Sequence, residues 1–264
     1  KVSGLHAGQR VLALTRFGGY AEFVATDARA VIPVSESISF GEATALATQY
    51  STAYYCAEEV TRLHKGDHVL IHAAAGGVGT ALVQIAKNKG CIIYGTASKS
   101  KLKHLEEQGV NFPINYREID FAKAIRAITG KRGLDVIFDS IGGTSVNKGY
   151  RLLNYGGKIV CLGASDLILA KGNIFKLLKL AIGFGLYSPI NMLKGSKSVI
   201  SVNMLHIADH HPELLQECLR GVIELYTKGH IKPIVGGEFN VNEIASAHNF
   251  LESRKSIGKI VVTW

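Results

Sequence analysis

The sequence predicts an α/β protein in which a doubly wound parallel sheet is inserted in a second domain, and three observations lead to this prediction. Strand-like runs alternate with helix-like runs through the middle of the chain, which is the pattern of a parallel sheet covered by helices on both faces. The 29 glycines against only five prolines suit many tight turns between strands and helices. A length of 264 residues, 47% of them hydrophobic and 19% charged, suits about two globular domains and excludes a fibre, a disordered tail and a disulfide miniprotein.

The first part of the chain contains short apolar runs at residues 10–14 and 19–24. Each run is short and rich in apolar residues, which favours short antiparallel strands.

The middle of the chain carries the alternation of strands and helices. It starts with a buried strand at residues 68–73, and the helix that follows ends at Gly90. Apolar residues at helical spacing form one stripe on this helix: Val78, Ala81, Leu82, Ile85 and Ala86. Further strands are expected at residues 91–96, 112–115, 135–139, 158–163 and 198–203, with helices at 100–108, 121–129 and 145–153. Six parallel strands are therefore predicted.

The last part of the chain, like the first part, lacks the regular alternation of strands and helices that marks the middle. A helix near residues 242–251 precedes a terminal strand at residues 257–263. We infer that both ends form one second domain, made of residues 1–47 and 205–264. The parallel-sheet domain then comprises residues 48–204.

Charge and cysteine content limit the setting in which this chain works. Lys and Arg number 30 and Asp and Glu 21, so the net charge of +9 should attract anions, without choosing among nucleotides, nucleic acid and lipid headgroups. The cysteines are widely spaced and lack the clustering of zinc sites, which favours a reduced, cytoplasmic location: Cys56, Cys91, Cys161 and Cys218. We expect no membrane span, because no apolar run approaches the roughly 20 residues that a bilayer requires.

The strongest local signal is the segment Ala74 to Gly79, AAGGVG, between a predicted strand and a predicted helix. In this variant of the dinucleotide fingerprint, Gly76 lets the backbone approach a pyrophosphate and Gly79 permits close packing of helix on strand. The helix N-terminus adds unpaired N–H groups and a partial positive charge. We therefore predict nucleotide binding; the alternative is a tight strand-to-helix turn with no ligand.

The second signal is a missing carboxylate. In NAD-selective folds an acidic residue about 20 positions beyond the glycine motif holds the ribose 2′-hydroxyl. Here Ala97 lies at that position, within a segment of hydroxyls and cations that includes Ser98 and Lys101. These side chains suit the extra charge of a 2′-phosphate, so NADPH is predicted over NADH. The alternative for Lys99 and Lys103 is a solvated, lysine-rich helix start.

Other catalytic and metal motifs are absent from the sequence. It has no G-x-S-x-G, no H-E-x-x-H and no phosphate loop ending in G-K-[ST]. His206 and His210, with Asp209 beside them, have the spacing of a metal pair, but a polar helix start is the favoured interpretation. His72 lies just before the glycine motif, where it could approach a cofactor, but a packed strand histidine is favoured. We predict no metal site.

Several segments together resemble the medium-chain dehydrogenase/reductases, and within them the branch of quinone oxidoreductases, zeta-crystallin and vesicle-amine-transport-protein-like proteins. The resemblance covers the whole chain and rests on GGYAEFV (residues 18–24), STAYY (51–55), HAAAGGVG (72–79), GTAS (95–98), INYRE (114–118), DSIGG (139–143), GHIKP (229–233) and SIGKIVV (256–262). It implies a Rossmann domain that binds NADPH, inserted in a partial GroES-like catalytic domain.

The resemblance also implies a set of cofactor contacts, which we carry over position by position. They are Gly76, Gly77 and Val78 at the pyrophosphate; Ser98, Lys101 and Tyr116 around the 2′-phosphate; Ser140 at the adenine ribose; Gly163 near the switch point of the sheet; Thr52, Val202 and Asn203 near the nicotinamide; and Arg254, which would reach the cofactor from the catalytic domain.

Two departures from the family pattern affect the predicted chemistry. Where zinc-dependent alcohol dehydrogenases have a cysteine ligand, this chain has Thr48, so we expect a zinc-free enzyme. The sequence starts at Lys1, without Met or an apolar leader, so no signal peptide is expected and the family's first stretch is missing. The active-site Asn and Tyr of the family have no counterpart here, and the catalytic residues stay unknown.

The expected reaction is transfer of hydride from NADPH to a quinone or an α,β-unsaturated carbonyl without zinc. The alternatives are an enoyl-thioester reductase and a non-catalytic relative that binds a nucleotide or RNA. We expect a homodimer and a small electrophilic substrate, and no nucleic acid, because no basic segment is interleaved with aromatics. The apolar residues 174–193 would suit a wall of the substrate pocket, with dimer packing or core as equal alternatives.

Overall fold

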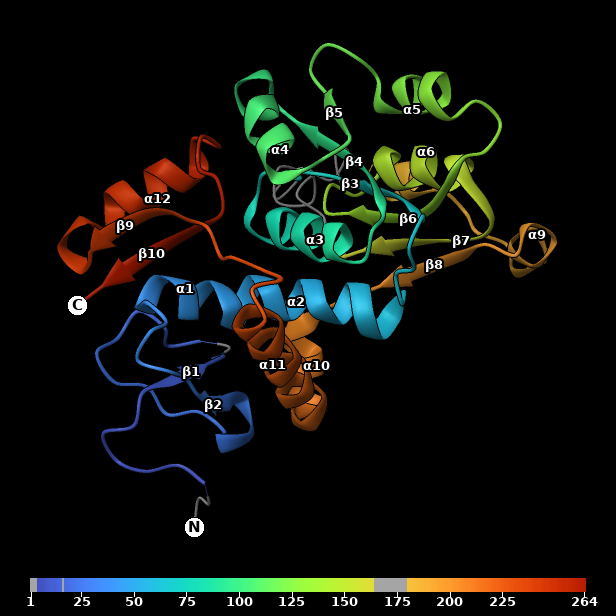
Figure 1. Cartoon of the computed structure of the whole chain (residues 1–264). Helices are drawn as coiled ribbons and strands as arrows, with labels where there is room; N and C mark the ends of the chain where they lie inside the picture. Colours follow the sequence, from blue (N-terminus) through green and yellow to red (C-terminus); the bar gives the residue numbers. More distant parts are fainter. Residues whose placement is uncertain (1–3, 16, 164–179) are drawn as a thin grey trace. The chain divides into compact units, whose positions relative to one another are not determined.

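The computed structural model describes residues 4–15, 17–163 and 180–264 (Figure 1). Its internal contacts divide the chain into two units. The terminal unit consists of Lys1–Tyr55, Gly76–Ala81 and Met204–Trp264, and the sheet unit of Cys56–Ala75 and Leu82–Asn203. We describe the two units separately.

The sheet unit is built on six parallel strands, as the sequence predicts. They are β3 (His68–Ile71), β4 (Ile92–Ala97), β5 (Phe112–Asn115), β6 (Leu134–Asp139), β7 (Leu153–Cys161) and β8 (Ser198–Ser201). Their order across the sheet is β5-β4-β3-β6-β7-β8. The chain therefore builds outward from β3 in one direction and then, starting at β6, in the other.

Helices connect these strands. They are α3 (Gly77–Asn88), α4 (Leu102–Gln108), α5 (Phe121–Thr129), α6 (Thr144–Leu152) and α9 (Pro189–Gly195). Local signals set their ends: the Asp120 carboxylate accepts hydrogen bonds from the first amides of α5, and α4 ends at Gly109, whose φ of 92° suits glycine.

The core of the sheet unit lies where the central strands meet the helices. Leu70 on β3, Ile137 on β6 and Ile159 on β7 are completely buried. Since helices cover both faces of a parallel sheet, its strands read as nearly continuous apolar runs, which explains the segments HVLI and DVIF.

The terminal unit opens with β1 (Val11–Ala13), which pairs antiparallel with β2 (Val31–Pro33). The predicted strand at residues 19–24 is wrong, because these residues form bends and loop. Phe23 is 89% exposed, so this run has no buried face that would fix it as a strand.

The predicted terminal helix and strand are confirmed. The helix is α12 (Ile244–Glu252), and the strand β10 (Lys259–Thr263) pairs parallel with β9 (Val235–Asn240). Two further helices of this unit are α10 (Met204–His210) and α11 (Pro212–Thr227).

A nearly continuous helical run spans residues 40–60. It consists of α1 (Phe40–Ala45), a π-helical segment (Leu46–Tyr50), α2 (Ser51–Tyr54) and a second π-helical segment (Tyr55–Val60). The Ser39 hydroxyl and the Glu42 carboxylate cap its start reciprocally. Gly221 of α11 meets the Tyr54 ring so closely that a Cβ would overlap it.

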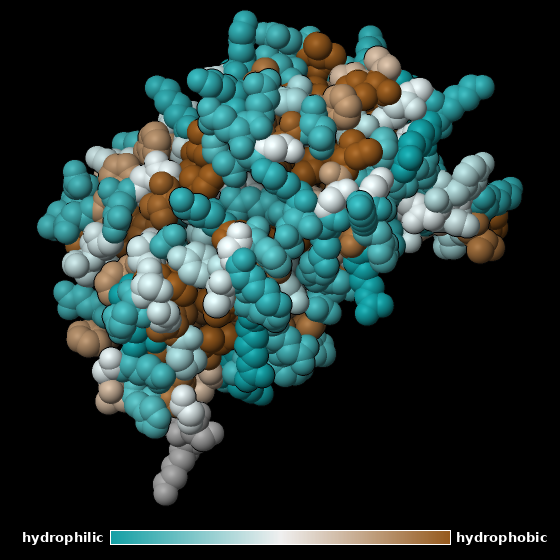
Figure 2. All heavy atoms as spheres, viewed as in Figure 1, coloured by the Kyte–Doolittle hydropathy of each residue, from teal (hydrophilic) through white to brown (hydrophobic). Residues whose placement is uncertain are grey.

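Hydrophilic side chains cover much of the face shown in Figure 2, with scattered apolar groups among them. Within the described ranges, no helix is both long and apolar enough to cross a membrane.

The central position of β6 leads to a stability prediction. The Ile137 side chain is completely buried. Replacing it by alanine should lower the free energy of unfolding by about 2–5 kcal/mol, because the cavity left between sheet and helix cannot collapse. Urea unfolding followed by circular dichroism measures this. The control Ile119→Ala, at a side chain that is 53% exposed, should cost only about 0.5 kcal/mol; equal losses would contradict the assigned core.

Candidate functional site

The carboxyl edge of the sheet is the natural place for a ligand. Strand order reverses between β3 and β6, because β4 and β5 lie on one side of β3 while β6, β7 and β8 lie on the other. At such a switch point the loops that follow the two central strands leave in opposite directions and open a crevice. The residues that follow β3 and β6 therefore lie at the candidate site.

A buried polar network joins the strand ends at this switch point. His72 follows β3, Thr96 lies near the end of β4, Asp139 ends β6, and Ser145 lies in the first turn of α6. The His72 Nδ1 lies 3.1 Å from the Thr96 Oγ1, and its Nε2 lies 3.4 Å from the Ser145 Oγ. The Ser145 hydroxyl donates to the Asp139 Oδ2 at 2.5 Å.

The Asp139 carboxylate is completely buried and saturated with hydrogen bonds. Its Oδ1 accepts from the backbone N–H groups of Ile141 and Gly142, each at 2.8 Å, while its Oδ2 accepts from Ser145. A buried carboxylate is tolerated when its oxygens are matched in this way. The loop between β6 and α6 is therefore held by Asp139.

His72 is a packed, neutral histidine, as the favoured interpretation of the sequence has it. Its ring is buried and meets the edge of the Phe121 ring at a centroid distance of 4.6 Å. Burial lowers the pKa of His72, and the nearby Asp139, which raises it, does not offset this. Sequence reasoning missed Thr96, Asp139 and Ser145; the signal available was a polar residue at or just beyond the end of each central strand.

The backbone is strained just before the glycine turn. Ala73 has a φ of 50°, a left-handed conformation that is uncommon for residues other than glycine, and its N–H donates to the Thr96 Oγ1 at 3.3 Å. Such conformations persist where neighbouring structure imposes them, and they concentrate at functional sites.

The glycine turn itself permits close approach of polar groups. The side-chain amide of Gln49 lies over Gly77, so near that a Cβ on residue 77 would overlap it. The Thr80 Oγ1, in the first turn of α3, is buried and has no hydrogen-bond partner among the described residues. Gly76 pairs with Gly258 in an isolated parallel bridge.

The residues predicted to surround a 2′-phosphate lie together. Ser98 and Tyr116 follow Ala97 and Asn115, which are register partners at the ends of β4 and β5. Lys101 lies one short turn after Ser98 and is partly buried, which lowers its pKa.

Lys99 and Lys103 differ from Lys101. Their side chains are 83% and 87% exposed, and they lie 3.7 Å from Glu118 and 4.0 Å from Glu107. The solvated alternative therefore describes these two lysines.

The predicted residues on the other side of the switch point also lie together. A Cβ on Gly163 would lie 3.3 Å from the Ser140 carbonyl oxygen. The Val202 N–H donates to the Cys161 carbonyl at 2.9 Å, which places Val202 and the adjoining Asn203 beyond β8, beside the end of β7. The carboxyl edge thus carries these four residues.

The remaining predicted contacts belong to the terminal unit, together with Gly76 and Val78. Thr52 lies in α2, and its hydroxyl donates to the Thr48 carbonyl at 2.8 Å. Arg254 follows α12 with a φ of 58° and precedes by four residues Gly258, the bridge partner of Gly76.

The last residues to place are the possible metal ligands and the apolar stretch assigned to a substrate pocket. No group of three or more His, Cys, Asp or Glu side chains that could hold a metal occurs in the part of the chain that the structure describes. The Thr48 hydroxyl donates to the Thr44 carbonyl at 3.0 Å. Of the apolar stretch assigned to a pocket wall, residues 174–179 lie outside the described residues.

Comparisons with known proteins agree with this geometry. The family model described as zinc-binding dehydrogenase matches residues 77–209. The chain is 33% identical to the synaptic vesicle membrane protein VAT-1 homolog of Homo sapiens over 263 residues, which are 99% of this chain and 66% of the relative. The same homolog of Danio rerio is also 33% identical, over 100% of this chain and 54% of the relative. The chain thus spans between about half and two thirds of the length of these relatives.

Solved structures show the same similarity. CurK enoyl reductase superposes with a TM-score of 0.84 at 28% identity, over 99% of this chain and 74% of that one. A mycobacterial protein complexed with NADPH superposes with a TM-score of 0.83 at 25% identity, over 99% of this chain and 76% of that one. Since the family model matches just over half of the chain and the resemblance found in the sequence agrees with it, this chain belongs to the medium-chain dehydrogenase/reductase family of oxidoreductases.

Proposed function

We propose that the carboxyl edge of the sheet and the glycine turn bind NADPH, and that the protein is a zinc-independent oxidoreductase that delivers hydride to a quinone or an α,β-unsaturated carbonyl. The observation that carries this proposal is the position of the predicted cofactor residues, which follow β4 to β8 at the edge where the strand order reverses. Family membership and the mycobacterial relative with NADPH support a nicotinamide cofactor.

The residues of the turn fit a pyrophosphate. The Gln49 amide lies over Gly77 at a distance that only glycine allows, so the turn tolerates a polar group in direct contact with its backbone. The Thr80 hydroxyl, which has no hydrogen-bond partner within the described ranges, lies in the first turn of the helix whose N-terminus would face the phosphates. Gly76, Gly77 and Val78 would hold the pyrophosphate.

The adenine end fits NADPH better than NADH. Neither Ser98 nor Lys101 is acidic, and we assign the Lys101 ammonium as the cationic partner of the 2′-phosphate. Tyr116 is 47% exposed beside them, available to the adenosine. Ser140 would hold the adenine ribose, and Gly163, Val202 and Asn203 would border the nicotinamide half, with Thr52 and Arg254 from the terminal unit.

Bound NADPH would supply the hydride, from C4 of its nicotinamide. The chain's own contribution is to bind, orient and exclude water, because no zinc ligand set is expected to polarise the acceptor. His72 does not supply the proton, since burial keeps it neutral and both ring nitrogens face hydroxyls. It supports the strand end from which the glycine turn starts.

The predicted organisation of the protein belongs to the same proposal. The NADPH-binding domain would comprise residues 48–204 and the partial GroES-like catalytic domain residues 1–47 and 205–264. A homodimer, a cytoplasmic location and a small electrophilic substrate remain predictions of the sequence.

A second candidate reaction is reduction of an enoyl thioester. The observation that favours it is the superposition on CurK enoyl reductase over nearly the whole chain. The two reactions share the cofactor and differ in the acceptor, so a direct comparison of acceptors separates them.

The first test is turnover. The longest natural form of the protein should oxidise NADPH with 9,10-phenanthrenequinone or with an enone, measured as loss of nicotinamide absorbance under steady-state conditions. A higher kcat/KM with a crotonyl thioester would establish the enoyl-thioester reductase instead. Absence of turnover with all three acceptors would contradict the oxidoreductase proposal.

The second test concerns cofactor choice. Lys101→Ala should weaken NADPH binding by about tenfold or more and leave NADH nearly unchanged, because it removes a charged partner of the 2′-phosphate alone. Isothermal titration with each cofactor measures both affinities. Lys103→Ala is the matched control on the same segment and should change neither. Equal loss of both cofactors in Lys101→Ala would refute the assigned role.

The third test concerns the charge of His72. Because burial lowers its pKa in the folded chain, the unfolded chain binds the proton first as the pH falls below about 6.5. Stability is therefore full above that pH and declines below it, with a slope of up to about 1.4 kcal/mol per pH unit from this residue.

Urea unfolding as a function of pH measures this slope. His72→Gln should flatten it relative to the wild type, whereas His64→Gln, the same exchange at an exposed position, should not. Burial also lowers the pKa of His68 and His104, so only the difference from the wild type belongs to His72. An unchanged slope in His72→Gln would show that this histidine is charged in the folded chain.

A further inference from the structure

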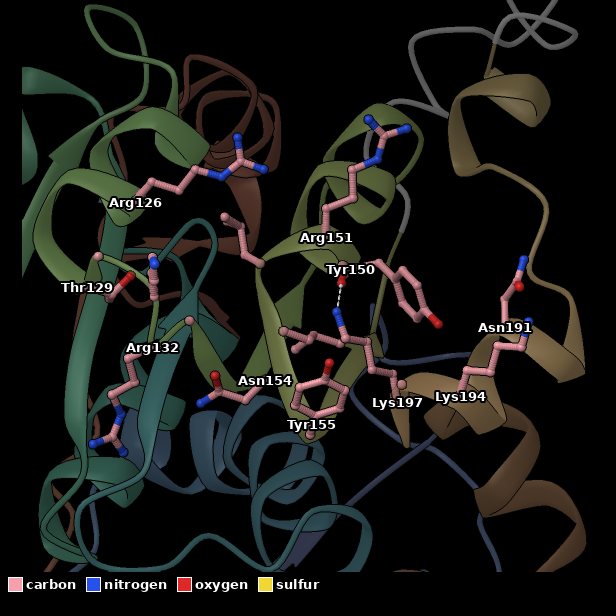
Figure 3. Close-up of a pocket in the computed structure, with 16 residues that line it drawn as sticks. Arg126, Thr129, Arg132, Tyr150, Arg151, Asn154, Tyr155, Asn191, Lys194 and Lys197 are labelled. Atoms are coloured by element: carbon pink, nitrogen blue, oxygen red, sulfur yellow. Dashed lines mark hydrogen bonds between the residues drawn. The ribbon is translucent and has the colours of Figure 1, made fainter.

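The sheet unit contains a second candidate site at the opposite edge of its sheet. A pocket of about 640 Å³ lies where β6, β7 and β8 begin, and its lining comes from residues 126–133, 150–155 and 191–197 (Figure 3). These segments are the end of α5 with the loop that follows it, the junction of α6 and β7, and the end of α9 with the loop before β8. None of the predicted cofactor contacts lines this pocket.

The pocket is strongly basic. Sixteen described residues line it, of which six are cationic and none is Asp or Glu. The cations are Arg126, Lys131, Arg132, Arg151, Lys194 and Lys197. Figure 3 shows Arg126 and Arg151 extending from α5 and α6, with Lys194 and Lys197 on the side of α9. Cations from three separate segments of the chain thus line one hollow.

Helix ends neutralise only part of this charge. The last turns of α5, α6 and α9 carry Arg126, Arg151 and Lys194, where a cation compensates the helix dipole. Three helix ends at about −0.5 each supply about −1.5, and Asp135, 3.4 Å from Arg132, supplies −1. Six cations against about −2.5 leave an excess of more than three positive charges, so capping of helices does not account for the pocket.

Lys197 is held inside the pocket by its contacts with Tyr150. Its Nζ donates to the Tyr150 carbonyl at 3.2 Å and lies 5.3 Å from the centroid of the Tyr150 ring (Figure 3). Partial burial lowers its pKa, because removal from water disfavours the charged form of the ammonium. An anionic ligand would offset that cost.

Polar and aromatic groups complete the lining. Tyr155 is 85% exposed at the rim, and the Asn154 amide is fixed by its hydrogen bond to Asp135 at 2.9 Å. Tyr155 therefore offers a ring face and a hydroxyl beside the cations.

We propose that this pocket binds a small molecule that carries several phosphate groups. Two arginines that extend toward the same hollow suit phosphate oxygens, which accept paired hydrogen bonds from a guanidinium. The volume lies within the range of small-molecule sites, whereas a nucleic-acid backbone needs a basic stripe along the surface. The site is distinct from the cofactor edge and does not depend on the proposed reaction.

The test uses inorganic tripolyphosphate as the probe, titrated calorimetrically into the chain with and without saturating NADPH. Binding with one-to-one stoichiometry that NADPH does not displace is expected. Arg126→Gln combined with Arg151→Gln should weaken it by at least about tenfold, which corresponds to about 1.4 kcal/mol. Lys65→Gln combined with Lys87→Gln, an equal loss of charge at exposed positions outside the pocket, should weaken it less than about twofold. Circular dichroism melting checks that both double variants fold.

The outcomes separate this site from its alternatives. No binding, displacement by NADPH, or equal loss in the two double variants would overturn the proposal. Two further arms compare phosphate sources: phosphatidylcholine vesicles that carry phosphatidylinositol bisphosphate, and a single-stranded RNA oligonucleotide. Vesicle binding that requires Arg126 and Arg151 would assign the phosphates to a lipid headgroup. RNA that binds more tightly than tripolyphosphate and shows a steep salt dependence would replace the small ligand by a nucleic acid.

Discussion

The buried carboxylate of Asp139 is the constraint on which the carboxyl edge depends. An anion without exposure to water is stable in a protein only when hydrogen bonds replace its hydration. Two backbone amides and the Ser145 hydroxyl do this here, and all three come from the loop after β6 and the first turn of α6. Asp139 therefore fixes the path of the chain on one side of the switch point, and Ser145 passes this restraint to His72 on the other side.

His72 links the two halves of the sheet because its ring has two nitrogens. One faces Thr96 on β4 and the other faces Ser145 on α6, so β3, β4 and α6 are held in one register by neutral contacts. Ala73, the next residue in the chain, has a strained positive φ, and its N–H donates to the same Thr96 hydroxyl oxygen. Because the strand end is rigid, the turn that follows it is already ordered. Its backbone amides could then bind phosphates with little loss of entropy.

Local signals predicted much of the fold, and long-range contacts account for what the sequence left open. The strand at 112–115 and the helix at 121–129 have the predicted bounds, because an apolar run and the Asp120 cap are local properties. The predicted strand at 19–24 is wrong because a short apolar run does not by itself supply a buried face. The Ser145 and His72 contact joins residues 73 positions apart and has no local signal. The cofactor residues after the strands were accessible through family motifs, whereas the basic pocket combines segments that share no motif.

The polarity of a parallel sheet explains why the two candidate anion sites differ in construction. At the carboxyl edge, strands lead into helix N-termini, so backbone amides and dipoles favour phosphate and few cations are needed; Lys101 is the cation predicted to contact phosphate there. At the opposite edge, helices end, and their carbonyls disfavour an anion. A phosphate site there has to be built from side chains in excess of the helix ends, which is the arrangement of Arg126, Arg151, Lys194 and Lys197. Part of the net charge of +9 is therefore located on the side of the sheet where the backbone offers an anion no help.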